Sequence, residues 1–141
     1  MRSDVPVGTT LSSGLDSSSI VSILRKFYND EHKTFTATFN KDEYQDTEKN
    51  IYKDDINIQE SDLVKKLSKD LNLKSFFIKA LDEDFINLLK RNIYHLESGH
   101  SSPAINPLSN TLDFAKDHVT VIMEGQGADE LLAGYINISA M

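Results

Sequence analysis

Short apolar runs alternate along the chain with segments of helical apolar periodicity, and this alternation limits the fold more than any other feature. Four strands are expected, at residues 5–11, 33–39, 74–79 and 119–123. Four helices are expected between them, at residues 17–28, 61–71, 82–95 and 106–116. Strands that alternate with helices form parallel sheets, because each helix carries the chain back to the end where the previous strand began. We therefore predict an α/β fold of three layers (α/β/α), with a mainly parallel twisted sheet between helices.

Capping residues predict where three of these helices begin. Ser17 and Asp82 are side chains that cap helix N-termini well. Asn106 is a third such residue, and Pro107 after it suits the first turn of a helix. The polar stretch at residues 40–59 has little apolar periodicity, and we expect a mobile insertion or lid there. No role is assigned to the insertion itself, at residues 42–58.

Composition excludes several classes of protein. The 141 residues fit one domain, and a net charge of −7 argues against a nucleic-acid partner. The chain has no Cys, so disulfides, thiolate zinc sites and a cysteine nucleophile are excluded within it. No apolar run is long enough to span a membrane, and we expect a cytoplasmic protein. The chain enters its first strand almost at once and stops just behind its last motif, so we expect a piece of a longer protein.

The first motif is LSSGLDSS, at residues 11–18. It places a glycine and several hydroxyls between a strand and a helix, where backbone N–H groups and a helix dipole can hold a nucleotide's phosphates. Asp16 would be repelled by phosphate unless a metal lies between them, so it indicates Mg²⁺. No Gly-Lys-Ser/Thr follows, so the loop is not a Walker A motif. The structural alternative is a tight turn capped by Ser17.

The second motif is EGQGADE, at residues 124–130. Two alternating glycines let the backbone approach a ligand closely. Asp129 and Glu130 lie where a short helix should begin, so one interpretation is that they only complement its dipole. The other is that Asp129 shares a Mg²⁺ ion with Asp16. Both motifs follow a strand, so we expect them to line one cleft at the carboxyl ends of the parallel strands.

At these residues the chain resembles a known family. LSSGLDSS resembles the pyrophosphate loop of the N-type ATP pyrophosphatases, which have the adenine nucleotide alpha-hydrolase-like fold. EGQGADELLAGY resembles the second signature of their asparagine synthetase branch. Three further pieces are similar to glutamine-hydrolysing asparagine synthetases: SDVPVG at residues 3–8, IYHLE at 93–97 and PAINPL at 103–108. The resemblance covers residues 2–135.

The resemblance implies that residues 1–141 are a synthetase (ATP pyrophosphatase) domain, truncated at both ends relative to the family. Such enzymes use ATP and Mg²⁺ to convert the side-chain carboxylate of aspartate into an acyl-adenylate, with release of pyrophosphate. Ammonia then attacks the acyl group. An N-terminal glutaminase domain, which begins with a catalytic Cys, supplies that ammonia from glutamine. A C-terminal segment supplies a basic residue for the pyrophosphate. We expect the isolated chain to be inactive.

The resemblance also implies roles for individual residues. Those that would hold the pyrophosphate are Ser12, Gly14, Asp16 and Ser17. Those that would flank the adenine through backbone groups are Leu11 and Thr38. Those at positions where the family contacts ATP are Glu124 and Gly125. Those that would hold Mg²⁺ are Asp16 and Asp129.

Two departures from the family bear on the chemistry. Ser13 stands where the first loop usually has a second glycine. The second signature usually reads Ser-Gly-Glu-Gly, and here Glu124 and Gln126 replace the Ser and the Glu. The family's Glu serves as a base in the ammonia step, whereas the Gln126 amide cannot take up a proton, which leaves Glu124 as the other catalytic candidate. Two alternatives to asparagine synthesis therefore stay open: an amidotransferase for another carboxylate, as in polysaccharide or peptide tailoring, and a non-catalytic nucleotide-binding module.

Overall fold

The computed structural model of the chain describes residues 3–28, 31–39, 60–79, 85–99, 104–132 and 134. The strands in these residues are β1 (Val7–Thr10), β2 (Lys33–Thr38), β3 (Lys74–Lys79) and β4 (Val121–Met123). The helices are α1 (Leu15–Phe27), α3 (Glu60–Asp70), α4 (Phe85–Leu96), α5 (Ile105–Ala115) and α6 (Ala128–Leu132). The predicted alternation of strands and helices is confirmed.

The four strands form one parallel sheet in the order β3-β2-β1-β4. The chain builds the sheet outward from β1 through β2 to β3, and then returns to add β4 on the other side of β1. The strand order therefore reverses between β1 and β4, and Thr9 pairs with Met123 at this point. In open α/β sheets the carboxyl ends of the strands at such a reversal are where ligands bind.

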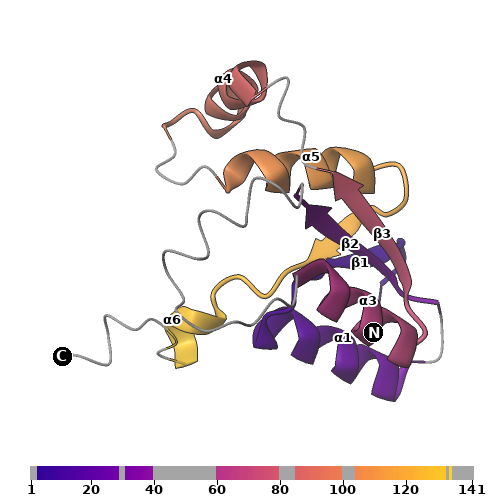
Figure 1. Cartoon of the computed structure of the whole chain (residues 1–141). Helices are drawn as coiled ribbons and strands as arrows, with labels where there is room; N and C mark the ends of the chain where they lie inside the picture. Colours follow the sequence, from indigo (N-terminus) through magenta and orange to yellow (C-terminus); the bar gives the residue numbers. More distant parts are fainter. Residues whose placement is uncertain are drawn as a thin grey trace.

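Helices cover both faces of the sheet, which gives the predicted three layers. Figure 1 shows α1 and α3 on one side of the sheet and α5 on the other. On the α1 side, buried Leu11, Val21 and Val64 form one apolar cluster. On the α5 side, Phe35 packs with Ala115 and Val119, among other residues.

Side chains along β2 alternate between the two faces of the sheet. Phe35 faces α5 and stacks on Phe76 of β3 with 5.4 Å between ring centroids. The neighbouring threonines are buried and satisfy their hydroxyls within the structure. Thr34 Oγ1 lies 2.7 Å from Ser75 Oγ, and the Thr36 hydroxyl donates to the Leu11 carbonyl at 2.7 Å. These hydrogen bonds offset the cost of placing threonine inside a sheet.

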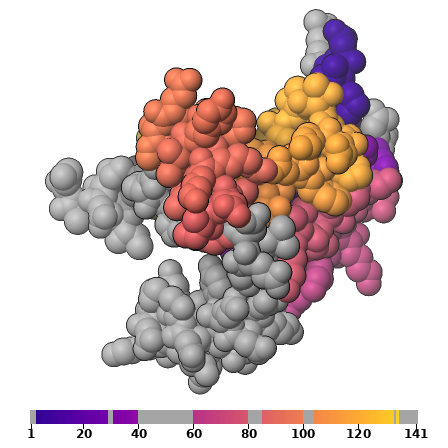
Figure 2. Space-filling view, turned by 90° about the horizontal axis from the view of Figure 1, so that it is seen from above, coloured from indigo at the N-terminus to yellow at the C-terminus, as the bar shows by residue number. Residues whose placement is uncertain are grey.

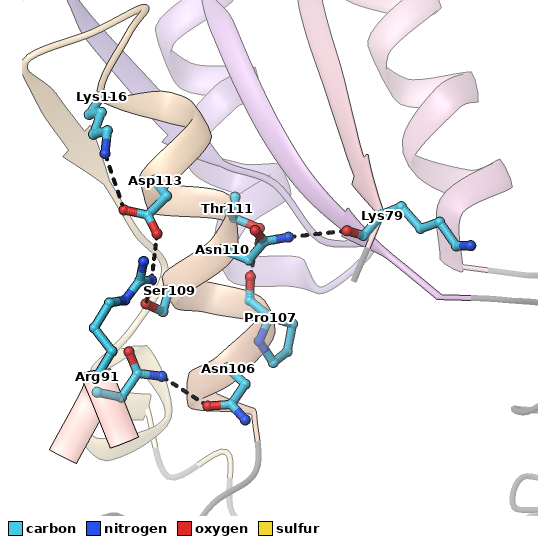
Figure 3. A network of polar contacts seen from close by, with 10 residues as sticks. Lys79, Arg91, Asn106, Pro107, Ser109, Asn110, Thr111, Asp113 and Lys116 are labelled. Atoms are coloured by element: carbon cyan, nitrogen blue, oxygen red, sulfur yellow. Dashed lines mark hydrogen bonds and ion pairs between the residues drawn. The ribbon is translucent and has the colours of Figure 1, made fainter. Parts of the chain in front are cut away.

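Polar contacts hold α5 against its neighbours (Figure 3). From α4, Arg91 forms an ion pair with Asp113 and donates to Ser109 at 2.9 Å. The Asn110 amide donates to the carbonyl of Lys79, the last residue of β3, at 3.1 Å. Seen from above, α4 and α5 form adjoining parts of one surface (Figure 2). These contacts fix the position of α5, whose first turns border the candidate site.

Two of the predicted helix caps are wrong. Helix α1 begins at Leu15 with Gly14 as its cap, two residues before the predicted start. Ser17 lies inside the first turn, where its hydroxyl accepts from the Ser12 N–H at 3.1 Å and so bonds to the preceding loop instead of capping. Helix α5 begins at Ile105, one residue before Asn106.

Asn106 is buried at the second position of α5 and accepts a hydrogen bond from the Asn92 amide at 2.9 Å. Pro107 follows within the first turn, where its missing N–H has no helical partner to lose. A proline at this point therefore does not determine the first helical residue. The predicted Asp82 cap and the predicted insertion at residues 40–59 lie outside the described residues.

Within the described part of the chain, none of the helices is both long and apolar enough to cross a bilayer.

Candidate nucleotide-binding site

The loops after β1 and β4 border one cavity at the reversal of strand order. This cavity has a volume of about 380 Å³, within the usual range for small-molecule sites. The β1 loop contributes Ser12 and Gly14, and the β4 loop contributes residues 124–127. Residues from α1, α3, α5, α6 and the ends of β1 and β2 also line it. The predicted convergence of the two motifs is therefore present in the structure.

The β1 loop is held in a tight conformation by its own serines. The Ser12 and Ser17 hydroxyl oxygens lie 2.9 Å apart, and the Gly14 N–H donates to Ser12 Oγ at 3.1 Å. The first helical hydrogen bond of α1 runs from the Ser18 N–H to the Gly14 carbonyl at 3.2 Å. The N–H groups before Ser18 belong to the first turn, which has no helical acceptors. This end of α1 borders the cavity, as an anion-binding helix terminus would.

The β4 loop packs directly onto this helix end through Gly125. A Cβ at Gly125 would lie 2.9 Å from the Asp16 Cβ and 3.0 Å from the Ser17 nitrogen. Real Cβ atoms do not approach other heavy atoms so closely, so no side chain fits there without movement of the loop. Gly127 has φ +91°, in the region that favours glycine. Gly125 thus lets the β4 loop approach α1 closely, and Gly127 allows a backbone conformation that other residues rarely adopt.

Carboxylates from both motifs border the cavity. The acidic residues of its lining are Asp16, Glu60, Glu124, Asp129 and Glu130. Among the described residues that line it there is no Lys, Arg or His. A highly charged phosphate chain therefore meets net repulsion here unless a cation neutralises it.

Asp16 and Asp129, the two carboxylates predicted to hold Mg²⁺, both line the cavity, and carboxylate oxygens are ligands that this ion takes. The described residues contain no group of three or more acidic, His or Cys side chains placed to hold a metal. Magnesium in phosphate sites does not need one, because it takes one or two carboxylates and completes its octahedral shell with phosphate oxygens and water. Gly134 supports Asp129: its N–H donates to the Asp129 carbonyl at 3.0 Å, and a Cβ there would overlap the Asp129 carboxylate.

Nearly all the predicted site residues line the cavity. They are Leu11, Ser12, Gly14, Asp16, Ser17, Glu124, Gly125, Gln126 and Asp129. Thr38 is not among the lining residues, and its hydroxyl donates to the Ile78 carbonyl at 3.3 Å.

Leu11 lines the cavity, but most of its backbone hydrogen-bonding groups already have partners. Its N–H donates to the Phe35 carbonyl at 2.9 Å, and its carbonyl already accepts from Thr36. Its side chain belongs to the core. The second lone pair of the Leu11 carbonyl is what remains for a ligand.

The sequence motifs did not reveal two parts of the wall. One is apolar and comes from the end of β2 and from α5, with Ala37, Phe39, Pro107 and Leu108. Such a surface suits the flat faces of a purine base. The other is Glu60, the first residue of α3, which approaches the β1 loop from a distant part of the sequence. The PAINPL segment, noted only as a piece similar to the family, is the signal that could have pointed to the α5 part, whereas nothing in the sequence distinguished Glu60.

Comparison with known proteins gives one consistent result. A model of the asparagine synthase family matches residues 1–140. Asparagine synthetase [glutamine-hydrolyzing] 1 of Bacillus subtilis (strain 168) is 36% identical over 135 residues, which are 96% of this chain and 19% of that protein. A putative asparagine synthetase [glutamine-hydrolyzing] of Mycobacterium bovis is 30% identical over 96% of this chain and 18% of that protein.

A putative asparagine synthetase [glutamine-hydrolyzing] 2 of Methanocaldococcus jannaschii is 30% identical, over 96% of this chain and 24% of that protein. The chain thus spans about a fifth of the length of the curated relatives it matches.

Proposed function

The chain belongs to the asparagine synthase family, whose fold is of the N-type ATP pyrophosphatase class, and on that premise we propose that it is the ATP- and Mg²⁺-binding part of a glutamine-dependent asparagine synthetase. The observation that carries the proposal is the meeting of the two glycine loops around one cavity, with Asp16 and Asp129 both in its wall. We propose the cytoplasm as its location.

The proposed reaction begins at the α-phosphate of ATP. An oxygen of the aspartate side-chain carboxylate attacks this phosphorus, and the bond to the β-phosphate oxygen breaks, which releases pyrophosphate and leaves an acyl-adenylate. Ser12, Gly14, Ser17 and the end of α1 would bind the departing pyrophosphate. Asp16 and Asp129 would hold Mg²⁺, which supplies charge neutralisation when bound.

Ammonia then attacks the acyl carbon, AMP leaves, and the nitrogen loses a proton. Gln126 occupies the family's catalytic position in this step but cannot accept that proton. Glu124 lines the same cavity from the same loop. We propose that the Glu124 carboxylate takes up the proton where the family uses the residue at position 126.

The negative charge of the cavity indicates what the chain would need from other groups to bind ATP. Its described lining offers carboxylates and no basic side chain, so ATP needs positive charge from elsewhere. We propose that Mg²⁺ and a basic residue from a C-terminal segment supply it, while an N-terminal glutaminase domain supplies ammonia. By itself, the 141-residue chain should bind ATP with Mg²⁺ weakly and show no turnover.

A second function is favoured by a specific residue. Because Gln126 alters the ammonia step, the acceptor could be a carboxylate other than aspartate, in a polysaccharide or a peptide. ATP–pyrophosphate exchange with a panel of carboxylates separates the two proposals. It should be run on a longer protein that contains the chain, because the chain alone is expected to show no turnover. Exchange that depends on aspartate supports asparagine synthesis, whereas exchange with another acid alone rejects it.

A further inference from the structure

The β1 loop makes one contact that its proposed role as a phosphate cradle does not explain. The Ser13 N–H donates to Glu60 Oε1 at 3.1 Å. Glu60 is the exposed first residue of α3 and lines the cavity. Ser12 and Gly14, on either side of Ser13, line the same cavity. A carboxylate therefore binds the loop at the edge of the space proposed for phosphate.

The acceptor of Ser13 differs in kind from those of its neighbours. The Ser12 N–H donates to Ser17 Oγ at 3.1 Å, and the Gly14 N–H donates to Ser12 Oγ at 3.1 Å. These two acceptors are neutral hydroxyls that belong to the loop and its helix. The acceptor of Ser13 is an anion from another helix, so it can leave without unfolding the loop.

An N–H group serves one strong acceptor at a time. A carboxylate and a phosphate oxygen are both anionic acceptors and also repel each other. We propose that Glu60 competes with the nucleotide's terminal phosphates for the Ser13 N–H, and thereby weakens nucleotide binding. This inference rests on the proposed function, because it assumes that the β1 loop binds the phosphates of ATP. Glu60 is thus a residue that sets affinity and takes no part in the chemistry.

The exposure of Glu60 makes the exchange feasible. Its side chain can rotate into solvent at little cost, and the first turn of α3 does not depend on it, since Asp62 also lies there. Among the described residues, four other carboxylates also line the cavity, at Asp16, Glu124, Asp129 and Glu130. Moving the Glu60 charge away from the phosphates relieves one part of that repulsion.

The test compares Glu60→Ala and Glu60→Gln with the matched control Asp62→Asn. Asp62 is an exposed acid of the same helix that pairs with Lys65 at 3.0 Å and does not line the cavity. Calorimetry with ATP and with inorganic pyrophosphate, each with Mg²⁺, measures affinity on the 141-residue chain. Nuclear magnetic resonance follows the Ser13 amide proton, which loses its charged acceptor in Glu60→Ala.

We expect Glu60→Ala to bind both ligands roughly 3- to 10-fold tighter, the range for one exposed charged hydrogen bond. Glu60→Gln keeps an acceptor without the charge and should fall between Glu60→Ala and the parent. Asp62→Asn should change affinity less than about twofold, since an exposed charge outside the site is screened.

Equal or weaker binding by Glu60→Ala, when the parent chain binds ATP, overturns the competition and leaves the proposed function standing. Weaker binding that more Mg²⁺ restores would instead make Glu60 a metal ligand. Absence of binding by every variant contradicts the proposed function itself, and the competition with it.

Discussion

Gly125 lies against Asp16 so closely that a Cβ on the glycine would be 2.9 Å from the Cβ of the aspartate. This relationship joins the two motifs, which the sequence places near opposite ends of the chain. It also puts the backbone of the β4 loop on the first turn of α1, the end of the helix that borders the cavity. The proposed site therefore depends on a glycine at position 125.

Gly125→Ala should weaken ATP binding and destabilise the chain. The new methyl group forces the β4 loop away from α1, which costs about 1–3 kcal/mol when there is no room for it. Gly99→Ala is the matched control, because a Cβ there has no heavy atom within 4 Å. Urea unfolding measures the stability and calorimetry measures ATP affinity. Normal values for both in Gly125→Ala would mean that the two loops do not pack as described.

Asp16→Asn and Asp129→Asn should each reduce the Mg²⁺-dependent part of ATP binding. Each removes one of the two carboxylates proposed for the ion, and we expect a loss of about 10-fold or more, the scale of disturbed metal sites. Asp117→Asn removes an exposed acid outside the cavity and serves as the control. A Mg²⁺ titration at fixed ATP gives the comparison. If all three variants match the parent, these carboxylates do not hold the ion.

Gln126→Glu tests the ammonia step. In a protein that contains this chain and forms amide, restoring a carboxylate at position 126 should raise the ammonia-dependent rate, because a base then stands at the family's position. Glu124→Gln should lower the rate if Glu124 takes the proton in the parent. The two variants are compared at saturating ATP and ammonia. An unchanged rate in both would exclude either residue as the base.

His32 should make the stability of the fold depend on pH. It is buried beside Thr9, with Nε2 and the threonine Oγ1 2.7 Å apart. Burial, and then the nearby charge of Arg25, lower its pKa below the ordinary 6.5. The unfolded chain then binds more protons than the folded chain, so stability rises with pH. The contribution of neutral His32 to the free energy of unfolding is fully present above the ordinary pKa of 6.5. It is lost as the pH falls from there through the lowered pKa of the folded chain.

Urea unfolding at about pH 5 and about pH 8 measures this dependence. His32→Gln should flatten the difference between the two, while His95→Gln, which changes an exposed ring, should leave it intact. An identical pH dependence in the parent and His32→Gln would contradict the assignment.

The sheet could be predicted from the sequence because its determinants are local. Phe35 and its flanking threonines alternate along β2, and that pattern alone separates the two faces of the strand. The order of β1 and β4 could not be read this way, because strand pairing depends on contacts between distant segments. The two motifs were expected to line one cleft at the carboxyl ends of the strands, and the structure adds that the strand order reverses there, between β1 and β4.

The helix caps were harder to predict because a serine hydroxyl has several acceptors and donors within reach. Ser17 has the right chemistry for a cap, yet its hydroxyl bonds to Ser12 across the loop. Asn106 likewise finds Asn92 on another helix. Ser17 thus bonds within its own motif, whereas for Asn106 a tertiary partner wins over the local one. Glu60 was missed for the same reason, since its contact with Ser13 joins two segments that no sequence motif links.

The central claim is that the β1 and β4 loops form a single Mg²⁺-dependent site for the phosphates of ATP. Calorimetric titration of the chain with ATP, with and without Mg²⁺, tests it most directly. The account predicts saturable binding with Mg²⁺ and little or none without it. The reason is that the described residues that line the cavity include carboxylates and no basic side chain. No binding at millimolar ATP with Mg²⁺, or equal binding without the ion, would contradict it.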